Sequence, residues 1–119
     1  MQYQDEYILR LVEQLGSMMR LAFSRFREGQ SSSEPLDVTK QAIQMIVDVD
    51  ADVFVRFSPR SMVSFIELSG FDDRLVVKLA EALNLQAEIL ESEGALVLSG
   101  VRREQAAAVM ESIDPERAN

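Results

Sequence analysis

The feature that most constrains the fold is an apolar pattern of helical period that runs from residue 3 to residue 28. The apolar residues recur at spacings of three and four, which predicts one long helix: Tyr3, Tyr7, Ile8, Leu11, Val12, Leu15, Met18, Met19, Leu21, Ala22, Phe23 and Phe26. At 1.5 Å per residue, this helix is about 39 Å long. A compact domain of this chain length has a diameter of roughly 35 Å, so the helix must run along the whole body.

The apolar arc of this helix covers roughly 200° of its circumference, which is wider than burial on one side requires. We predict that one edge of the arc is a self-association face, made of Tyr7, Leu11, Met18 and Leu21. The other edge is expected to face the protein's own core, through Ile8, Leu15, Phe23 and Phe26. The sequence leaves open the reverse assignment, and it leaves open the burial of both edges within one bundle. A two-fold homodimer would cover the excess apolar surface of this helix, because each chain contributes the same surface to the contact.

The rest of the sequence predicts an all-α fold of five to six helices in a single domain, residues 1–119. A flexible linker is expected at residues 29–34, a helical body at 35–113 and a frayed tail at 114–119. Within the body, start and stop signals such as Ser58-Pro59 and Asp72 predict helices at 33–49, 58–70, 72–93 and 102–113. The composition, 47% apolar and 27% charged, is that of an ordinary globular domain.

Two segments do not fit helices cleanly. Residues 47–57 place an apolar residue at every odd position, which is typical of a strand, and residues 95–98 are strand-like in composition. One interpretation is a short hairpin of these two segments. The other ends the preceding helix near Val49 and starts a short helix capped by Asp50 or Asp52. In that interpretation residues 95–99 extend or cap the long helix before them.

The net charge is −8, and all of it lies in residues 30–119, because the charges of residues 1–29 sum to zero. An acidic surface repels phosphate groups, so we expect neither a nucleic-acid partner nor an anionic membrane partner. The longest uncharged run, residues 94–101, is far shorter than the ~20 apolar residues that a membrane-spanning helix needs. The first residues are acidic where a signal peptide would be basic, so we expect a cytoplasmic protein.

Cysteine and histidine are both absent. Their absence removes thiolate chemistry, the commonest general base and the usual zinc ligands. Asp48, Asp50 and Asp52 match three ligand positions of an EF-hand loop, but Val53 and Pro59 stand where that loop needs glycine and glutamate. The five glycines are too widely separated to form a phosphate-binding loop. We therefore expect no metal, no cofactor and no catalytic residue.

These exclusions favour a non-enzymatic function of one of two kinds, with an enzyme that uses carboxylates as a weaker third alternative. The first is a protein-interaction or self-association module that uses the long first helix, either as a homodimer or with an unidentified protein partner. The second is a small-molecule binding bundle with a cavity between helices, since bundles lined by methionine and phenylalanine can be adapted to that use. A large apolar contact between protomers would favour the first function, and an enclosed pocket with convergent polar groups would favour the second.

One stretch of the first helix carries a family resemblance. The run from Tyr7 to Gly16, Tyr-Ile-Leu-Arg-Leu-Val-Glu-Gln-Leu-Gly, resembles the opening helix of a family of small uncharacterised bacterial proteins, a domain of unknown function. Leu79-Ala80-Glu81 and Ala106-Ala107-Ala108 look like the helical body of that family, which is similar to a tetratricopeptide-like C-terminal hairpin. The resemblance implies helices through residues 50–57, and it implies no activity, substrate or catalytic residue.

Overall fold

The computed structural model describes residues 2–29 and 31–113, with side chains described from Asp5 onward. The tail expected at 114–119 lies outside the described residues. Six helices follow one another along the chain: α1 (Gln2–Glu28), α2 (Ser33–Val47), α3 (Ala51–Phe54), α4 (Pro59–Ser69), α5 (Asp73–Ser92) and α6 (Leu96–Glu111). No strand occurs among the residues described, so the predicted all-α fold of five to six helices is confirmed.

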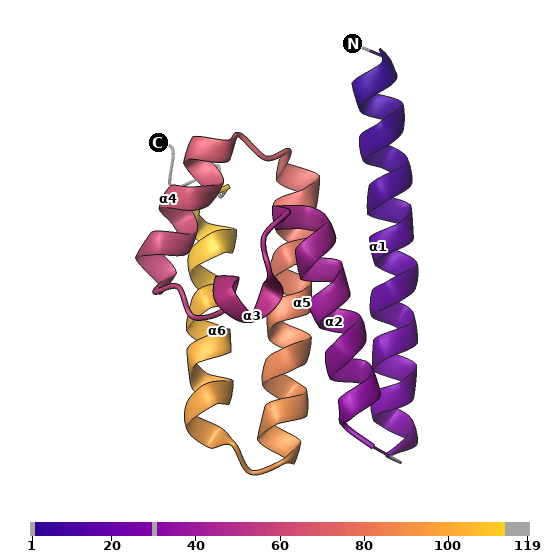
Figure 1. Cartoon of the computed structure of the whole chain (residues 1–119), viewed down its shortest axis with the longest axis vertical. Coiled ribbons are helices and arrows are strands. Elements are labelled where there is room, and N and C mark those ends of the chain that lie inside the picture. Colours follow the sequence, from indigo (N-terminus) through magenta and orange to yellow (C-terminus); the bar gives the residue numbers. More distant parts are fainter. Residues whose placement is uncertain (1, 30, 114–119) are drawn as a thin grey trace.

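Helices α1, α2, α5 and α6 run along the long axis of the molecule, which measures 43 × 28 × 26 Å (Figure 1). Helix α1 lies at one side and packs against α2 and α5, whereas α6 packs against α5 and α4. Helix α2 returns antiparallel to α1, and α5 runs in the same direction as α1 (Figure 1). With 27 residues, α1 is about 40 Å long and spans nearly the whole long axis, as its sequence predicted.

One main core holds the six helices together, because each of them contributes at least one buried apolar side chain to it. Phe54, from the short helix α3, is fully buried and packs against Phe57 and Phe65, with ring centroids 5.2 and 5.6 Å away. A smaller second cluster of buried side chains lies where α1 meets α5, and consists of Ala22, Leu85 and Ile89. The main core thus fixes α1 against the body, and the second cluster extends this contact toward the end of α1.

The segment 47–57 contains no strand. Helix α2 ends at Val47, Asp48 adopts a left-handed conformation with φ of 58°, and α3 follows. The carboxylate of Asp50 accepts hydrogen bonds from the backbone N–H groups of Asp52 and Val53 and so caps α3. The odd-position alternation was misleading because Phe54, at an even position, is the most deeply buried apolar residue of the segment.

Residues 95–99 form neither a strand nor an extension of α5. Gly94 has φ of 84° and reverses the chain, and Leu96 begins α6, six residues before the helix start predicted at Arg102. The start was missed because Ala95 at the N-cap has no side chain that could cap a helix. At the other end of the body, α2 begins at Ser33, where its start signal predicted, so the last two residues of the 29–34 linker belong to this helix.

Candidate functional site

The four residues of the predicted self-association face do not lie on one exposed row. Tyr7 is 66% exposed and Leu21 45% exposed, but Leu11 and Met18 are partly buried against the main core. The prediction for the opposite edge also holds only in part, because Leu15 is fully buried whereas Phe23 is 43% exposed. The buried stripe of α1 therefore runs along the middle of its apolar arc.

Both edges of that arc consequently carry exposed apolar side chains. On one side of the buried stripe are Tyr7 and Leu21; on the other are Leu9 and Phe23. This division arises because α1 lies in the angle between α2 and α5, and each of these helices covers only part of the arc. The sequence could reveal the width of the arc but not where the neighbouring helices would touch it.

The edge next to α5 borders a surface groove of about 290 Å³. Met19 and Phe23 of α1 form one bank, and the other bank comes from α5 through Glu81, Asn84, Leu85 and Glu88. The side chain of Leu85 belongs to the second buried cluster and forms the apolar floor. The guanidinium carbon of Arg27 lies 5.6 Å from the centre of the Phe23 ring, a cation–π contact at the end of the groove.

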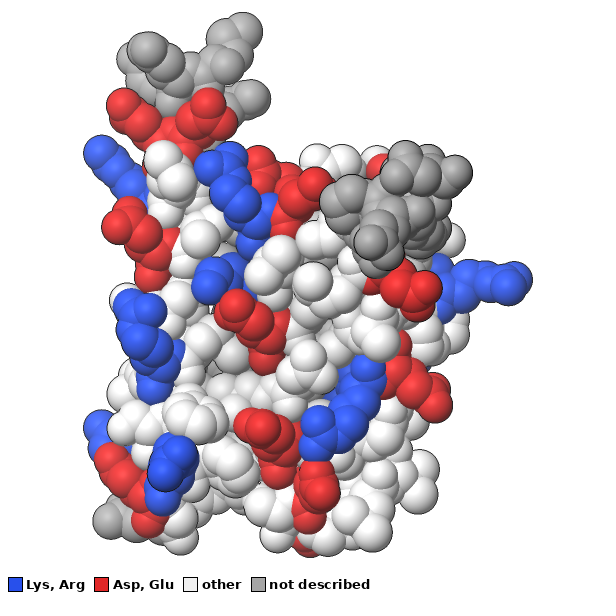
Figure 2. All heavy atoms as spheres, turned by 180° about the vertical axis from the view of Figure 1, so that it is seen from behind, with Lys and Arg blue, Asp and Glu red and all other residues white. Residues whose placement is uncertain are grey.

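Charges of opposite sign stand on the two banks. Arg20 and Arg27 project from α1, and Glu81 and Glu88 project from α5. Glu81 pairs with Lys78 of its own helix at 3.2 Å, but within the described part of the chain Arg20, Arg27 and Glu88 form no ion pair. Figure 2 shows this side of the molecule, with basic and acidic groups interspersed around a hollowed, uncharged surface.

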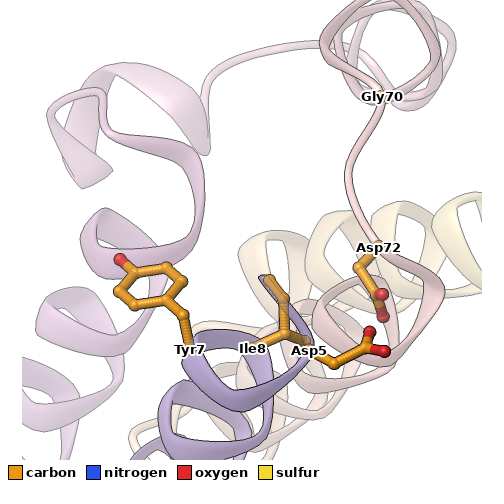
Figure 3. Close-up of a pocket in the computed structure, with 5 residues that line it drawn as sticks. All are labelled: Asp5, Tyr7, Ile8, Gly70 and Asp72. Atoms are coloured by element: carbon orange, nitrogen blue, oxygen red, sulfur yellow. The ribbon is translucent and has the colours of Figure 1, made fainter. Parts of the chain in front are cut away.

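A second hollow of about 410 Å³ lies where the first turns of α1 and α5 approach each other, lined by Asp5, Tyr7, Ile8, Gly70 and Asp72 (Figure 3). The two carboxylates point toward one another, and Arg74 pairs with both, at 3.6 Å to Asp5 and 2.9 Å to Asp72. Hydrogen bonds from the side chain and backbone of Arg74 lower the pKa of Asp72 from 3.8 to about 2. The lowered pKa keeps the Asp72 carboxylate ionised near neutral pH, where it pairs with Arg74.

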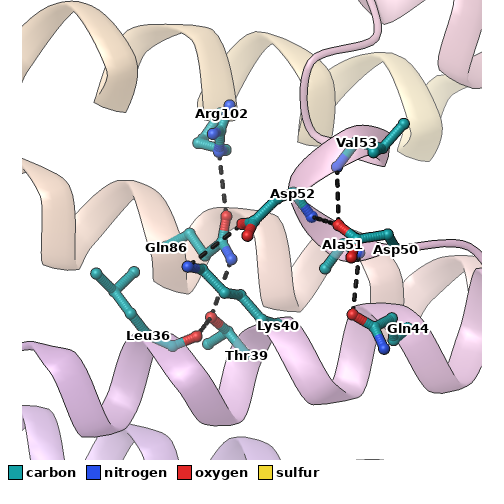
Figure 4. Close-up of polar contacts among 10 residues, drawn as sticks. All are labelled: Leu36, Thr39, Lys40, Gln44, Asp50, Ala51, Asp52, Val53, Gln86 and Arg102. Carbon is teal, nitrogen blue, oxygen red and sulfur yellow. Dashed lines mark hydrogen bonds and ion pairs between the residues drawn. The ribbon is translucent and has the colours of Figure 1, made fainter.

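A buried polar network joins α2, α5 and α6 (Figure 4). Gln86 donates to Thr39 at 3.0 Å and accepts from Arg102 at 3.1 Å. Gln105 donates to the backbone carbonyl oxygens of Val55 and Phe57, which follow α3. Burial lowers the pKa of Arg102, and the nearby charge of Asp52 opposes this effect. Every described buried side-chain polar atom has a hydrogen-bond partner, so the network stabilises the fold and leaves no group free for a ligand.

Sequence reasoning did not identify this network. A usable signal existed, since Thr39, Gln86 and Gln105 each lie among apolar residues on the inward side of a helix. A polar residue on that side must find a partner when it is buried, but its position does not say which one.

The three aspartates that resemble an EF-hand loop have separate local roles. Asp48 ends α2, Asp50 caps α3, and Asp52 pairs with Lys40 at 3.3 Å (Figure 4). Within residues 2–29 and 31–113, no group of three or more carboxylates is placed to hold a metal ion. The same residues include no helix with the length and apolar character needed to cross a bilayer.

No protein-family model, curated protein or solved structure matches the chain. The resemblance to small bacterial helical proteins and to a tetratricopeptide-like hairpin therefore stays a prediction.

Proposed function

We propose that the protein is a non-enzymatic interaction module that forms a homodimer through α1. The observation that supports this is the uncovered apolar surface on both edges of α1, at Tyr7, Leu9, Leu21 and Phe23. Monomeric proteins rarely leave extended apolar patches open to water, and a two-fold dimer is the commonest way to cover one. A cytoplasmic location and a lack of nucleic-acid binding belong to the same proposal, with the net charge of −8 as support for the second.

The alternative, a ligand cavity between helices, has weaker support. The two largest described hollows, of about 410 and 430 Å³, lie at the ends of the bundle rather than between its central helices. Polar and charged groups form much of their lining, whereas sites for small organic molecules are mostly apolar. The proposal of a non-enzymatic protein rests on the lack of histidine and cysteine in the sequence.

Multi-angle light scattering after gel filtration tests the dimer. We expect a mass of twice the 13.4 kDa of one chain at protein concentrations of about tens of micromolar, typical of a moderate association constant. Leu68 is 89% exposed on α4, which packs mainly against α6, so Leu68→Glu should leave the mass unchanged. A mass of one chain for the wild type would contradict the proposal.

A further inference from the structure

The α1–α5 groove is the part of the surface best suited to a second copy of the chain. Phe23 is only partly covered by its own protomer although it lies beside an apolar floor made by Leu85. Aromatic side chains at the centre of an interface, set in a pocket with apolar walls, commonly contribute most of the binding free energy. Phe23 has this setting, whereas none of the pockets described includes Leu21 on the other edge.

The charges on the two banks have the same spacing. Arg20 and Arg27 are seven residues apart on α1, and Glu81 and Glu88 are seven residues apart on α5. Seven residues are two helical turns, about 10.5 Å along each axis. The two helices run in the same direction, since Asp5 near the start of α1 pairs with Arg74 at the start of α5, while Phe26 and Ser92 share a hollow near their ends.

A two-fold axis parallel to these helices makes the face complementary to itself. It places α1 of one protomer opposite α5 of its partner at the same height, so that arginines face glutamates. A two-fold axis perpendicular to the helices would instead place like charges opposite each other, which destabilises a complex. We propose that the homodimer is built groove to groove around the parallel axis, with Arg20 between the partner's Glu81 and Glu88, Arg27 reaching back to the partner's Glu88, and Phe23 packing at the centre.

The outer surface of α1 and α5 is large enough for a stable dimer interface. Helix α5 has 20 residues and is about 30 Å long, and two adjacent helices are about 20 Å wide. Their outer face therefore covers about 600 Å² in projection, and more as accessible surface. Stable interfaces bury about 800 Å² per partner, roughly a tenth of a small protein's surface. The accessible surface of this chain is 7354 Å².

A charge-exchange experiment tests this inference, which rests on the proposed homodimer. Arg27→Glu and Glu88→Arg should each weaken dimerisation by roughly tenfold in Kd, measured by sedimentation equilibrium at low salt, because each places like charges across the axis. The double variant Arg27→Glu/Glu88→Arg restores opposite charges and should recover most of the wild-type affinity. Both positions are exposed, so circular dichroism should show unchanged helix content.

Two further variants distinguish a dimer interface at the groove from one at the opposite edge of α1. Phe23→Ala should weaken the dimer strongly, whereas Leu21→Glu should leave it intact. If Leu21→Glu dissociates the dimer and the groove variants do not, the groove is not the interface. The proposed homodimer through α1 would still stand. A wild-type monomer would overturn both. A double charge variant no tighter than the single variants would also contradict the pairing across the axis.

Discussion

The side chain of Asp72 both caps the start of α5 and binds an arginine side chain. Its carboxylate accepts a hydrogen bond from the backbone N–H of Arg74 at 2.8 Å and also binds the guanidinium of the same residue. One carboxylate therefore caps α5 and fixes an arginine that reaches across to α1 at Asp5. Sequence reasoning identified the cap, because capping is local, but it could not identify the contact with Asp5 across the fold.

This arrangement predicts a pH-dependent stability. The folded state lowers the pKa of Asp72 from 3.8 to about 2, so the ionised carboxylate stabilises the fold above about pH 4 and this contribution is lost as the pH falls toward 2. Asp72→Asn keeps a cap but removes the charge, so it should be less stable than wild type near pH 7 by an amount that shrinks in acid. Asp72→Ala should cost about 1 kcal/mol near pH 7.

Urea unfolding, followed by circular dichroism at several pH values, measures both effects. Asp73→Asn is a matched control, because the neighbouring carboxylate accepts no capping hydrogen bond. A difference between wild type and Asp72→Asn that stays constant with pH would show that the ionised carboxylate is not stabilised by Arg74.

At the scale of the helices, glycine-to-alanine substitutions test where α4 ends and whether residue 100 lies inside α6. Gly70 and Gly100 are the two positions. Gly70 follows α4 with φ of 66°, a conformation that alanine adopts only with strain. Gly100 lies inside α6, and a Cβ atom placed there would have nothing within 4 Å. Gly70→Ala should therefore lower the free energy of unfolding by about 1 kcal/mol, and Gly100→Ala should raise it by about 0.5–1 kcal/mol.

Thermal unfolding of the two variants beside the wild type decides the matter, since the expected shifts have opposite signs. A stabilising Gly70→Ala would mean that α4 does not end in a left-handed residue. A destabilising Gly100→Ala would mean that residue 100 is not in the interior of a helix.

The helices were predictable to the extent that their signals were local. Ser58 with Pro59 marked the start of α4, and the Ser58 hydroxyl indeed accepts a hydrogen bond from the N–H of Ser61. The start of α6 was missed because no capping side chain precedes it and its first turn exposes three apolar residues, Leu96, Val97 and Leu98. The interpretation of 47–57 stayed open because the burial of Phe54 depends on helices distant in sequence.

At the scale of the whole molecule, all six helices share the main core, which predicts one cooperative unfolding transition. Leu15 is fully buried where α1 meets that core, so Leu15→Ala should destabilise the protein by about 2–5 kcal/mol. The transition should remain single, because α1 has no separate core on which to fold.

Leu68→Ala provides the control, since Leu68 is 89% exposed on α4 and its loss should change stability by less than about 0.5 kcal/mol. Far-ultraviolet circular dichroism and tyrosine fluorescence, recorded at one protein concentration, should give the same midpoint for each variant. Separate melting of α1 before the remaining helices would contradict a shared core.

The candidate site was predictable only as a property of α1. The width of the apolar arc indicated surplus surface, and the structure retains that surplus at Tyr7 and Phe23. The sequence could not show which edge borders α5, because that depends on how the chain returns after residue 72. For the same reason, the matched spacing of charges on α1 and α5 became visible only once the two helices were side by side.

The common direction of α1 and α5 has an electrostatic consequence for the hollow in Figure 3. Aligned peptide dipoles give each helix about half a positive charge at its N-terminus, and two helices that run together bring both of these charges to the same end of the molecule. Asp5, Asp72 and Asp73 are gathered at this end. These carboxylates therefore lie where the two helix macrodipoles both favour negative charge.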